Sequence, residues 1–284
     1  MIKYLSLFSG IGAFEKALDR LQIPFELVGY CEIDKYAAKA YSLLHGVPES
    51  MNFGDITKLN EKELPDDIDL ITYGFPCQDI SLAGHQKGLL NEDGTKTRSG
   101  LFFDALRIIE HTQPKITIAE NVKNLTGTKF SEQFSIVLQG LEDAGYNNYW
   151  KVLNAKDYEI PQNRERVLIV SIRKDIDTGI FEFPEPVELR LRLKDLLEGS
   201  VDEKYYVNPE KVKALTDSLI EKQISNTIRA DRHQWDFGCS SEVVKIGNTG
   251  EHQKDGVYDP EGISTTLLAS HYKQPIQIIE RNEQ

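Results

Sequence analysis

The sequence predicts an α/β protein with a doubly wound, mostly parallel sheet and a smaller, irregular second lobe. Apolar strand-like runs alternate with amphipathic helical segments through the first 175 residues, and the alternation then stops. This pattern is typical of a parallel sheet covered by helices. A chain of 284 residues can form one large core with an appended lobe. We therefore expect one domain over residues 1–175 and a second over residues 176–284.

Each expected element follows from the spacing of its apolar residues. Apolar positions recur at i, i+3, i+4 and i+7 in the helices, whereas the strands are short apolar runs. The strands are expected at residues 3–8, 26–33, 68–74, 115–120, 148–154 and 166–172, and the helices at 14–21, 36–44, 101–111 and 130–144. The last two strands have no helix between them, which suggests an antiparallel edge hairpin.

The segment after residue 176 is polar and rich in glycine. One helix is expected at 209–223, with short strands around Val243 and Ile263. No apolar run of about 18 residues predicts a membrane span, and we interpret the N-terminal apolar run as a core strand rather than a signal peptide. The net charge is −12, and acidic residues outnumber basic ones in both halves. Bulk charge therefore gives no sign of a nucleic-acid partner, although local Lys and Arg placement decides such binding.

The three cysteines are Cys31, Cys77 and Cys239. An odd, sparse set argues against a disulfide framework and for a reducing compartment. No His/Cys spacing suggests a metal site, so we expect none. Cys31 lies in the apolar run LVGYCEI and is expected to be a small buried hydrophobe, whereas Cys239 has no assigned role.

A first candidate site lies where the first strand meets the first helix. The stretch FSGIG, residues 8–12, lets a ligand approach the backbone and the N–H groups of a helix N-terminus. Glu32 lies at the end of the second expected strand, where a carboxylate can bind both ribose hydroxyls of a nucleoside. Asp55 could bind an adenine amino group. The alternative is that the glycines only form a tight turn.

Three further segments carry candidate chemistry. Cys77 follows the carboxyl end of a strand and precedes a glycine-punctuated loop, a place that suits a nucleophile covered after substrate entry. Glu120 ends an apolar strand, where burial could let it carry a proton. Arg164 and Arg166 alternate and could hold a carboxylate, phosphate or base oxygen from one face. The alternatives are a buried structural cysteine, a helix-capping or loop-ordering carboxylate and a solvated strand start.

Together these segments resemble the motifs of the cytosine-C5 DNA methyltransferases. FSGIG is similar to the first motif of that family, GFPCQDIS to the fourth, ENV to the sixth and QNRER to the eighth. CEID, GDI and LFFDALRII resemble the second, third and fifth. The segments occur in family order and cover residues 3–172. The combination of GFPCQ, ENV and QxRxR makes the resemblance highly specific.

The resemblance implies the Rossmann-like fold of S-adenosylmethionine-dependent methyltransferases. It implies S-adenosylmethionine as the methyl donor, S-adenosylhomocysteine as the product, and double-stranded DNA as the partner, with the target cytosine flipped out of the duplex. The methionine portion would contact the first motif, and the second and third motifs would hold the ribose and adenine. The implied cofactor residues are Phe8, Ser9, Gly10, Ile11, Gly12, Glu32, Ile33, Asp55, Ile56 and Leu101.

The resemblance also implies the chemistry. The Cys77 thiolate would add to C6 of cytosine, Glu120 would contact N3 and the amino group, Arg164 would hold O2 and Arg166 would anchor the site. Residues 79–99 would form the loop that closes over the base. Two other positions complete the implied catalytic set, Pro76 and Gln78. Candidate DNA contacts are Ser81, Gln86, Lys87, Arg98, Gln162, Arg229, Arg232 and His233.

No segment similar to the ninth and tenth family motifs follows the expected recognition lobe. Three explanations stay open: a fragment, a subunit of a split enzyme completed by a second polypeptide, and a shortened protein that binds without turnover. The leading hypothesis is a DNA (cytosine-5-)-methyltransferase of a restriction-modification or phage modification system, acting in the cytoplasm. The alternatives are a non-catalytic DNA-binding subunit, an RNA cytosine-C5 methyltransferase and, remotely, a nicotinamide-dependent dehydrogenase.

Overall fold

The computed structural model describes the N-terminal two thirds of the chain and short strands beyond it. The described residues are 1–76, 89, 97, 99–196, 199, 245–248, 256–258, 264–265 and 277–278. The chain forms two compact units. The first comprises Met1–Leu153 and Glu165–Pro184, and the second comprises Asn154–Arg164 and Glu185–Gln284.

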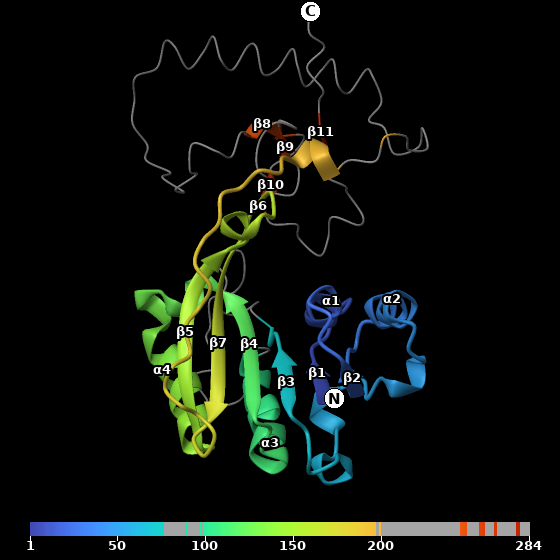
Figure 1. Ribbon diagram of the computed structural model, residues 1–284, viewed down its shortest axis with the longest axis vertical. Helices are drawn as coiled ribbons and strands as arrows, with labels where there is room; N and C mark the ends of the chain where they lie inside the picture. Colours follow the sequence, from blue (N-terminus) through green and yellow to red (C-terminus); the bar gives the residue numbers. More distant parts are fainter. Residues whose placement is uncertain are drawn as a thin grey trace, which may run out of the picture. The chain divides into compact units, whose positions relative to one another are not determined.

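The first unit is built on a six-stranded sheet with the order β2-β1-β3-β4-β7-β5 (Figure 1). β1, β2, β3 and β4 are parallel, and β7 runs antiparallel to β4. The strands are β1 (Ile2–Leu7), β2 (Phe25–Cys31), β3 (Leu70–Tyr73), β4 (Ile116–Val122), β5 (Tyr146–Asn154) and β7 (Glu165–Arg173). The predicted α/β class with a mostly parallel sheet is confirmed.

Four α-helices alternate with these strands in the described part of the chain, as the apolar periodicity predicts. They are α1 (Ala13–Arg20), α2 (Lys35–His45), α3 (Phe102–Thr112) and α4 (Ser131–Asp143). The start of α2 is fixed by Asp34, whose carboxylate accepts hydrogen bonds from the N–H groups of Tyr36 and Ala37. α2 ends at Gly46, which adopts the left-handed conformation that favours glycine at a helix C-terminus.

Short 3₁₀ turns connect the longer elements. In the first unit they are η1 (Glu49–Met51), η2 (Ile56–Lys58), η3 (Glu61–Glu63), η4 (Ser99–Leu101), η5 (Lys123–Thr126) and η6 (Thr128–Phe130). Arg107 on α3 fixes two of them, because its guanidinium donates hydrogen bonds to the carbonyl oxygens of Ile56 and Leu59 and pairs with Glu61. The segment that contains Asp55 is therefore held against α3 by hydrogen bonds.

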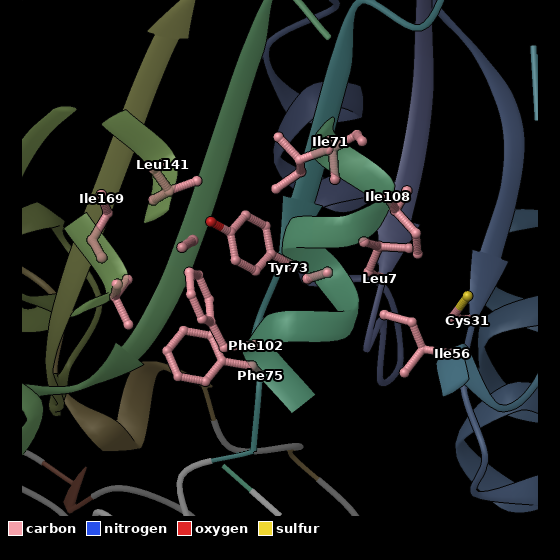
Figure 2. Close-up of a cluster of buried hydrophobic side chains, with 14 of the residues drawn as sticks. Leu7, Cys31, Ile56, Ile71, Tyr73, Phe75, Phe102, Ile108, Leu141 and Ile169 are labelled. Atoms are coloured by element: carbon pink, nitrogen blue, oxygen red, sulfur yellow. The ribbon is translucent and has the colours of Figure 1, made fainter. Parts of the chain in front are cut away.

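The core lies between the sheet and α3 and α4, and it contains the first cysteine. Tyr73, Phe75 and Phe102 form its aromatic centre, and Cys31 lies near Ile56 (Figure 2). Cys31 is 2% exposed, and burial raises the pKa of its thiol to about 12. The expectation that Cys31 is a small buried hydrophobe is confirmed.

The link between the last two long strands contains short elements that were not expected from the sequence. β7 inserts between β4 and β5, so that β5 forms the sheet edge. The link contains η7 (Ala155–Tyr158) and the short strand β6 (Gln162–Asn163), and it belongs to the second unit. Its polar sequence carried no strand periodicity that could have revealed β6.

The second unit contains short strands in the part that the structure describes. β6 pairs in parallel with β10 (Ser264–Thr265), while β8 (Lys245–Asn248), β9 (Gly256–Tyr258) and β11 (Gln277–Ile278) form a three-stranded sheet. The unit also includes the 3₁₀ turn η8 (Leu193–Leu196). The expected helix at 209–223 and Cys239 lie outside the described residues. Among the described helices, none is both long and apolar enough to cross a membrane.

Candidate active site

The turn after β1 adopts a backbone conformation that favours glycine. Phe8, Gly10 and Gly12 have positive φ angles of 54°, 57° and 85°. The Gly12 N–H closes the turn by donating to the Ser9 carbonyl oxygen at 3.0 Å. Among the residues that the structure describes, no side chain caps the N-terminus of α1. The backbone N–H groups there can serve a ligand, as the glycine-rich sequence predicts.

Glu32 lies beside this turn, at the carboxyl end of β2. Its Oε2 accepts a hydrogen bond from the Gly10 N–H at 2.9 Å, and its Oε1 accepts one from the Asp34 N–H at 2.8 Å. Asn52 holds the Glu32 backbone, donating to its carbonyl oxygen at 2.9 Å and accepting from its N–H at 3.0 Å. The structure therefore brings the predicted carboxylate into contact with the predicted glycine turn.

Asp55 organises the next segment along this edge. Its Oδ1 accepts hydrogen bonds from the Thr57 N–H at 3.0 Å and the Thr57 hydroxyl at 2.8 Å. These bonds hold the pKa of the Asp55 carboxyl below its ordinary value. The other oxygen, Oδ2, lies 3.8 Å from Nζ of Lys58.

The remaining cofactor candidates differ in exposure. Ile33 is 77% exposed and can present an apolar face to a ring. Ile56 is 3% exposed and packs in the core, so that its side chain does not reach the surface. Leu101 is half-buried against the core.

The chemistry of these residues suits a nucleoside ligand. The Glu32 carboxylate is of the kind that can accept hydrogen bonds from vicinal hydroxyls, and Ile33 next to it in the chain has an exposed apolar side chain. Within the described residues, Oγ of Ser9 is buried and has no hydrogen-bond partner. An unsatisfied buried hydroxyl is costly unless some group pairs with it. The Ser9 hydroxyl is therefore available to form a hydrogen bond with a ligand.

A second cluster lies on the central strands of the same unit. Arg166 on β7 places its Nε 3.0 Å from Oε1 of Glu120 on β4. The exposed fractions are 20% for the Arg166 side chain and 28% for the Glu120 side chain. A Cβ on Gly74 would lie 3.6 Å from Oε2 of Glu120, at ordinary contact distance, so the carboxylate lies close to the end of β3. The Glu120 carboxylate is therefore paired with Arg166 beside the residue that follows β3.

Asn121 connects this cluster to the end of β3. The side chain is 3% exposed, and its Nδ2 donates a hydrogen bond to the Phe75 carbonyl oxygen at 3.1 Å. Its Oδ1 accepts one from the Val122 N–H at 2.8 Å. Asn121 therefore fixes the backbone just before Pro76, the last described residue ahead of position 77.

Comparison with known proteins identifies the family. The family model "C-5 cytosine-specific DNA methylase" matches residues 2–284. The chain belongs to the C-5 cytosine-specific DNA methylase family. The match extends beyond residues 3–172, where the motifs of the resemblance lie.

Relatives of this methylase come from phages and bacteria. The orphan methyltransferase M.SPRI of Bacillus phage SPR is 35% identical over 95% of the chain and 64% of its own length. M.Rho11sI of Bacillus phage rho11s is 34% identical over 94% and 58%. The type II methyltransferase M.HhaI of Haemophilus parahaemolyticus is 36% identical over 94% and 74%. The chain thus spans less than two thirds of the two phage proteins, and the comparisons give no support for a second polypeptide.

Solved structures agree on the fold of this methylase. The Dnmt2 methyltransferase of S. pombe superposes with a TM-score of 0.59 at 20% identity, covering 100% of this chain and 77% of that one. A putative DNA modification methyltransferase encoded within an E. coli prophage superposes with a TM-score of 0.56 at 20% identity, covering 94% and 82%.

The remaining predicted site residues of the methylase lie either in the second unit or outside the described residues. Arg164 and Gln162 belong to the second unit, where the Arg164 N–H donates to Asn154 Oδ1 at 3.0 Å. Cys77, the predicted nucleophile, lies outside the described residues. So do Gln78, Ser81, Gln86, Lys87, Arg98, Arg229, Arg232 and His233.

Two residues near the candidate site were not singled out from the sequence. Asn121 stood inside a quoted motif without a role of its own, although a buried asparagine in a strand signals a required hydrogen bond. His45 ends α2 and carries no sequence signal. Its ring lies against the turn after β1, with Nε2 3.0 Å from the Ile11 carbonyl oxygen.

Proposed function

We propose that this chain is a DNA (cytosine-5-)-methyltransferase that acts on double-stranded DNA in a phage or restriction-modification system. Membership of the C-5 cytosine-specific DNA methylase family supports this reaction. The observation that carries the proposal is the pair formed by Arg166 and Glu120, next to a Phe75–Pro76 backbone fixed by Asn121. Residues 1–175 would carry catalysis and cofactor binding, and residues 176–284 would recognise the target in the cytoplasm of the host cell.

The donor site of the proposed enzyme is the edge formed by the ends of β1 and β2. Residues 8–12 would hold the methionine portion, Glu32 the ribose hydroxyls, Ile33 the adenine face and Asp55 the adenine amino group. When bound, S-adenosylmethionine supplies an electrophilic methyl group and leaves as S-adenosylhomocysteine. Glu32 is already oriented by the Gly10 and Asp34 N–H groups, so that little reorganisation is needed on binding.

The proposed chemistry begins at the flipped cytosine, because a stacked base is out of reach. The Cys77 thiolate forms a bond to C6, and the electron pair of the C5–C6 double bond moves toward C5. Glu120, held by Arg166, delivers a proton to N3 and so avoids a build-up of negative charge on the ring. After C5 has gained the methyl group, the C5 proton passes to solvent and the thiolate is expelled from C6. The N3 proton then returns to Glu120, which restores the aromatic ring and the initial state of the enzyme.

Trapping on DNA that contains 5-fluorocytosine tests this proposal. Fluorine cannot leave C5 as a proton does, so the enzyme should stay covalently bound to the base. We expect an adduct with the wild type and none with Cys77→Ala, while the control Cys239→Ala still forms it. The catalytic proposal fails if the wild type forms no adduct in the presence of S-adenosylmethionine.

A further inference from the structure

The ring of His45 fills a space that exists only because residue 12 is a glycine. A Cβ built on Gly12 would lie 2.1 Å from Nε2 of His45, well inside contact distance. The same Nε2 lies 3.0 Å from the Ile11 carbonyl oxygen. Since a carbonyl oxygen only accepts hydrogen bonds, Nε2 is the donor. The last residue of α2 thus holds the turn between β1 and α1.

A buried tyrosine holds His45 in this position. Tyr41 lies one helical turn earlier, with its ring centroid 4.7 Å from that of His45. Tyr41 is fully buried, stacks on Tyr30 with centroids 4.0 Å apart, and donates a hydrogen bond from its hydroxyl to Oε1 of Glu15 at 2.8 Å. Glu15 lies in the first turn of α1. α2 therefore contacts both the turn and the start of the helix that follows it.

The turn is held from two sides. Glu32 binds the Gly10 N–H at 2.9 Å, and His45 binds the carbonyl oxygen of the next residue, Ile11. The turn has two glycines with positive φ, and glycine exchanges readily between backbone conformations. External hydrogen bonds are therefore needed to keep one conformation, and a site that is organised before binding loses less free energy when the ligand arrives.

We propose that His45 is a positioning residue for the cofactor site. It donates to the Ile11 carbonyl and so holds residues 8–12 in the conformation that receives the methyl donor. The identity of that ligand rests on the proposed function, whereas the hydrogen bond by which His45 holds the turn does not depend on it. His45 itself need not touch the ligand.

The test compares His45→Ala with His45→Gln, whose amide can restore a donor, and with Leu44→Ala as the matched control. Leu44 is the neighbouring residue of α2 and is 65% exposed. Without ligand, hydrogen exchange is followed at the Gly12 and Lys16 N–H groups, which bond to the Ser9 and Gly12 carbonyl oxygens. With ligand, calorimetry gives the dissociation constant of S-adenosylmethionine, and kcat is measured at a saturating donor concentration.

Loss of one hydrogen bond predicts exchange about three- to tenfold faster in His45→Ala, with a rise of similar size in the dissociation constant. The value of kcat should stay within about twofold, His45→Gln should recover most of the loss, and Leu44→Ala should match the wild type.

Unchanged exchange and affinity in His45→Ala would overturn the inference, and so would equal losses in Leu44→Ala. A wild type that binds no donor would refute the proposed function and the cofactor half of this inference. In that case faster exchange in the unliganded His45→Ala chain would still support the hold on the turn, and unchanged exchange would refute it.

Discussion

The guanidinium of Arg166 and the carboxylate of Glu120 face each other across β7 and β4, with Nε 3.0 Å from Oε1. The register of this antiparallel pair sets Arg166 opposite Val122, two positions along the strand from Glu120. Both side chains therefore lie on the same face of the sheet. The pair is partly buried, so that it is screened less by solvent than an exposed pair.

Arg166→Gln is expected to slow the covalent step, because Glu120 loses the group that orients it. The rate of adduct formation on 5-fluorocytosine DNA should fall about 10- to 100-fold, with donor affinity unchanged. The matched control is Lys123→Gln, which breaks the exposed pair with Glu165 next to the site. Such pairs contribute at most about 1 kcal/mol. Equal trapping rates in the wild type and Arg166→Gln would show that the pair is only structural.

Asn121→Ala is expected to lower both stability and activity. The change leaves the Phe75 carbonyl oxygen without its buried donor and frees the backbone that leads to Cys77. The free energy of unfolding in urea should fall by about 1–3 kcal/mol, and adduct formation should slow even below the unfolding transition. Asn147→Ala serves as control, since its amide donates to Asp177 in an exposed position. Normal trapping by a destabilised Asn121→Ala protein would contradict the positioning role.

Glu32→Gln tests the proposed ribose contact with an isosteric change. An amide can accept at one oxygen only, so the turn and the ligand then compete for it. The dissociation constant of S-adenosylmethionine should rise about tenfold or more by calorimetry. Glu26→Gln, exposed near the start of the same strand, should bind like the wild type. Unchanged affinity in Glu32→Gln would remove the carboxylate from the cofactor site.

The sequence predicted the first unit well because its elements bury apolar faces with a regular period. α3 and β4 are examples, each found within two residues of its expected bounds. In the second unit, strands such as β10 and β11 have two residues each, too few for any period to show. Tertiary pairing defines them rather than local sequence.

In the candidate site, too, some residues could be predicted from the sequence and others could not. Glu32 and Glu120 could be placed from the sequence because the ends of parallel strands meet at one edge of the sheet. The contact of His45 with Ile11, 34 residues away, leaves no local pattern. The bond from Asn121 to Phe75, 46 residues away, is equally long-range. Roles of this kind depend on how packed elements meet and become visible only in the structure.

The buried thiol of Cys31 should make the free energy of unfolding depend on pH. Burial raises the pKa of its thiol from 9.0 to about 12, so the folded state keeps the proton while the unfolded state loses it above about pH 9. The contribution of this protonated thiol to the free energy of unfolding is complete below pH 9.0 and is lost as the pH rises toward 12. Between about pH 9 and 10 tyrosines also begin to ionise in the unfolded chain, but they do so equally in the wild type and in a cysteine variant.

In that window the free energy of unfolding should decline with pH more steeply in the wild type than in Cys31→Ala, and urea titrations at several pH values measure both slopes. The difference approaches about 1.4 kcal/mol per pH unit once unfolded Cys31 is fully ionised. Cys239→Ala is a second single-cysteine variant for comparison. Parallel slopes for the wild type and Cys31→Ala would mean that the thiol ionises as easily in the folded protein, in conflict with its exposed fraction of 2%.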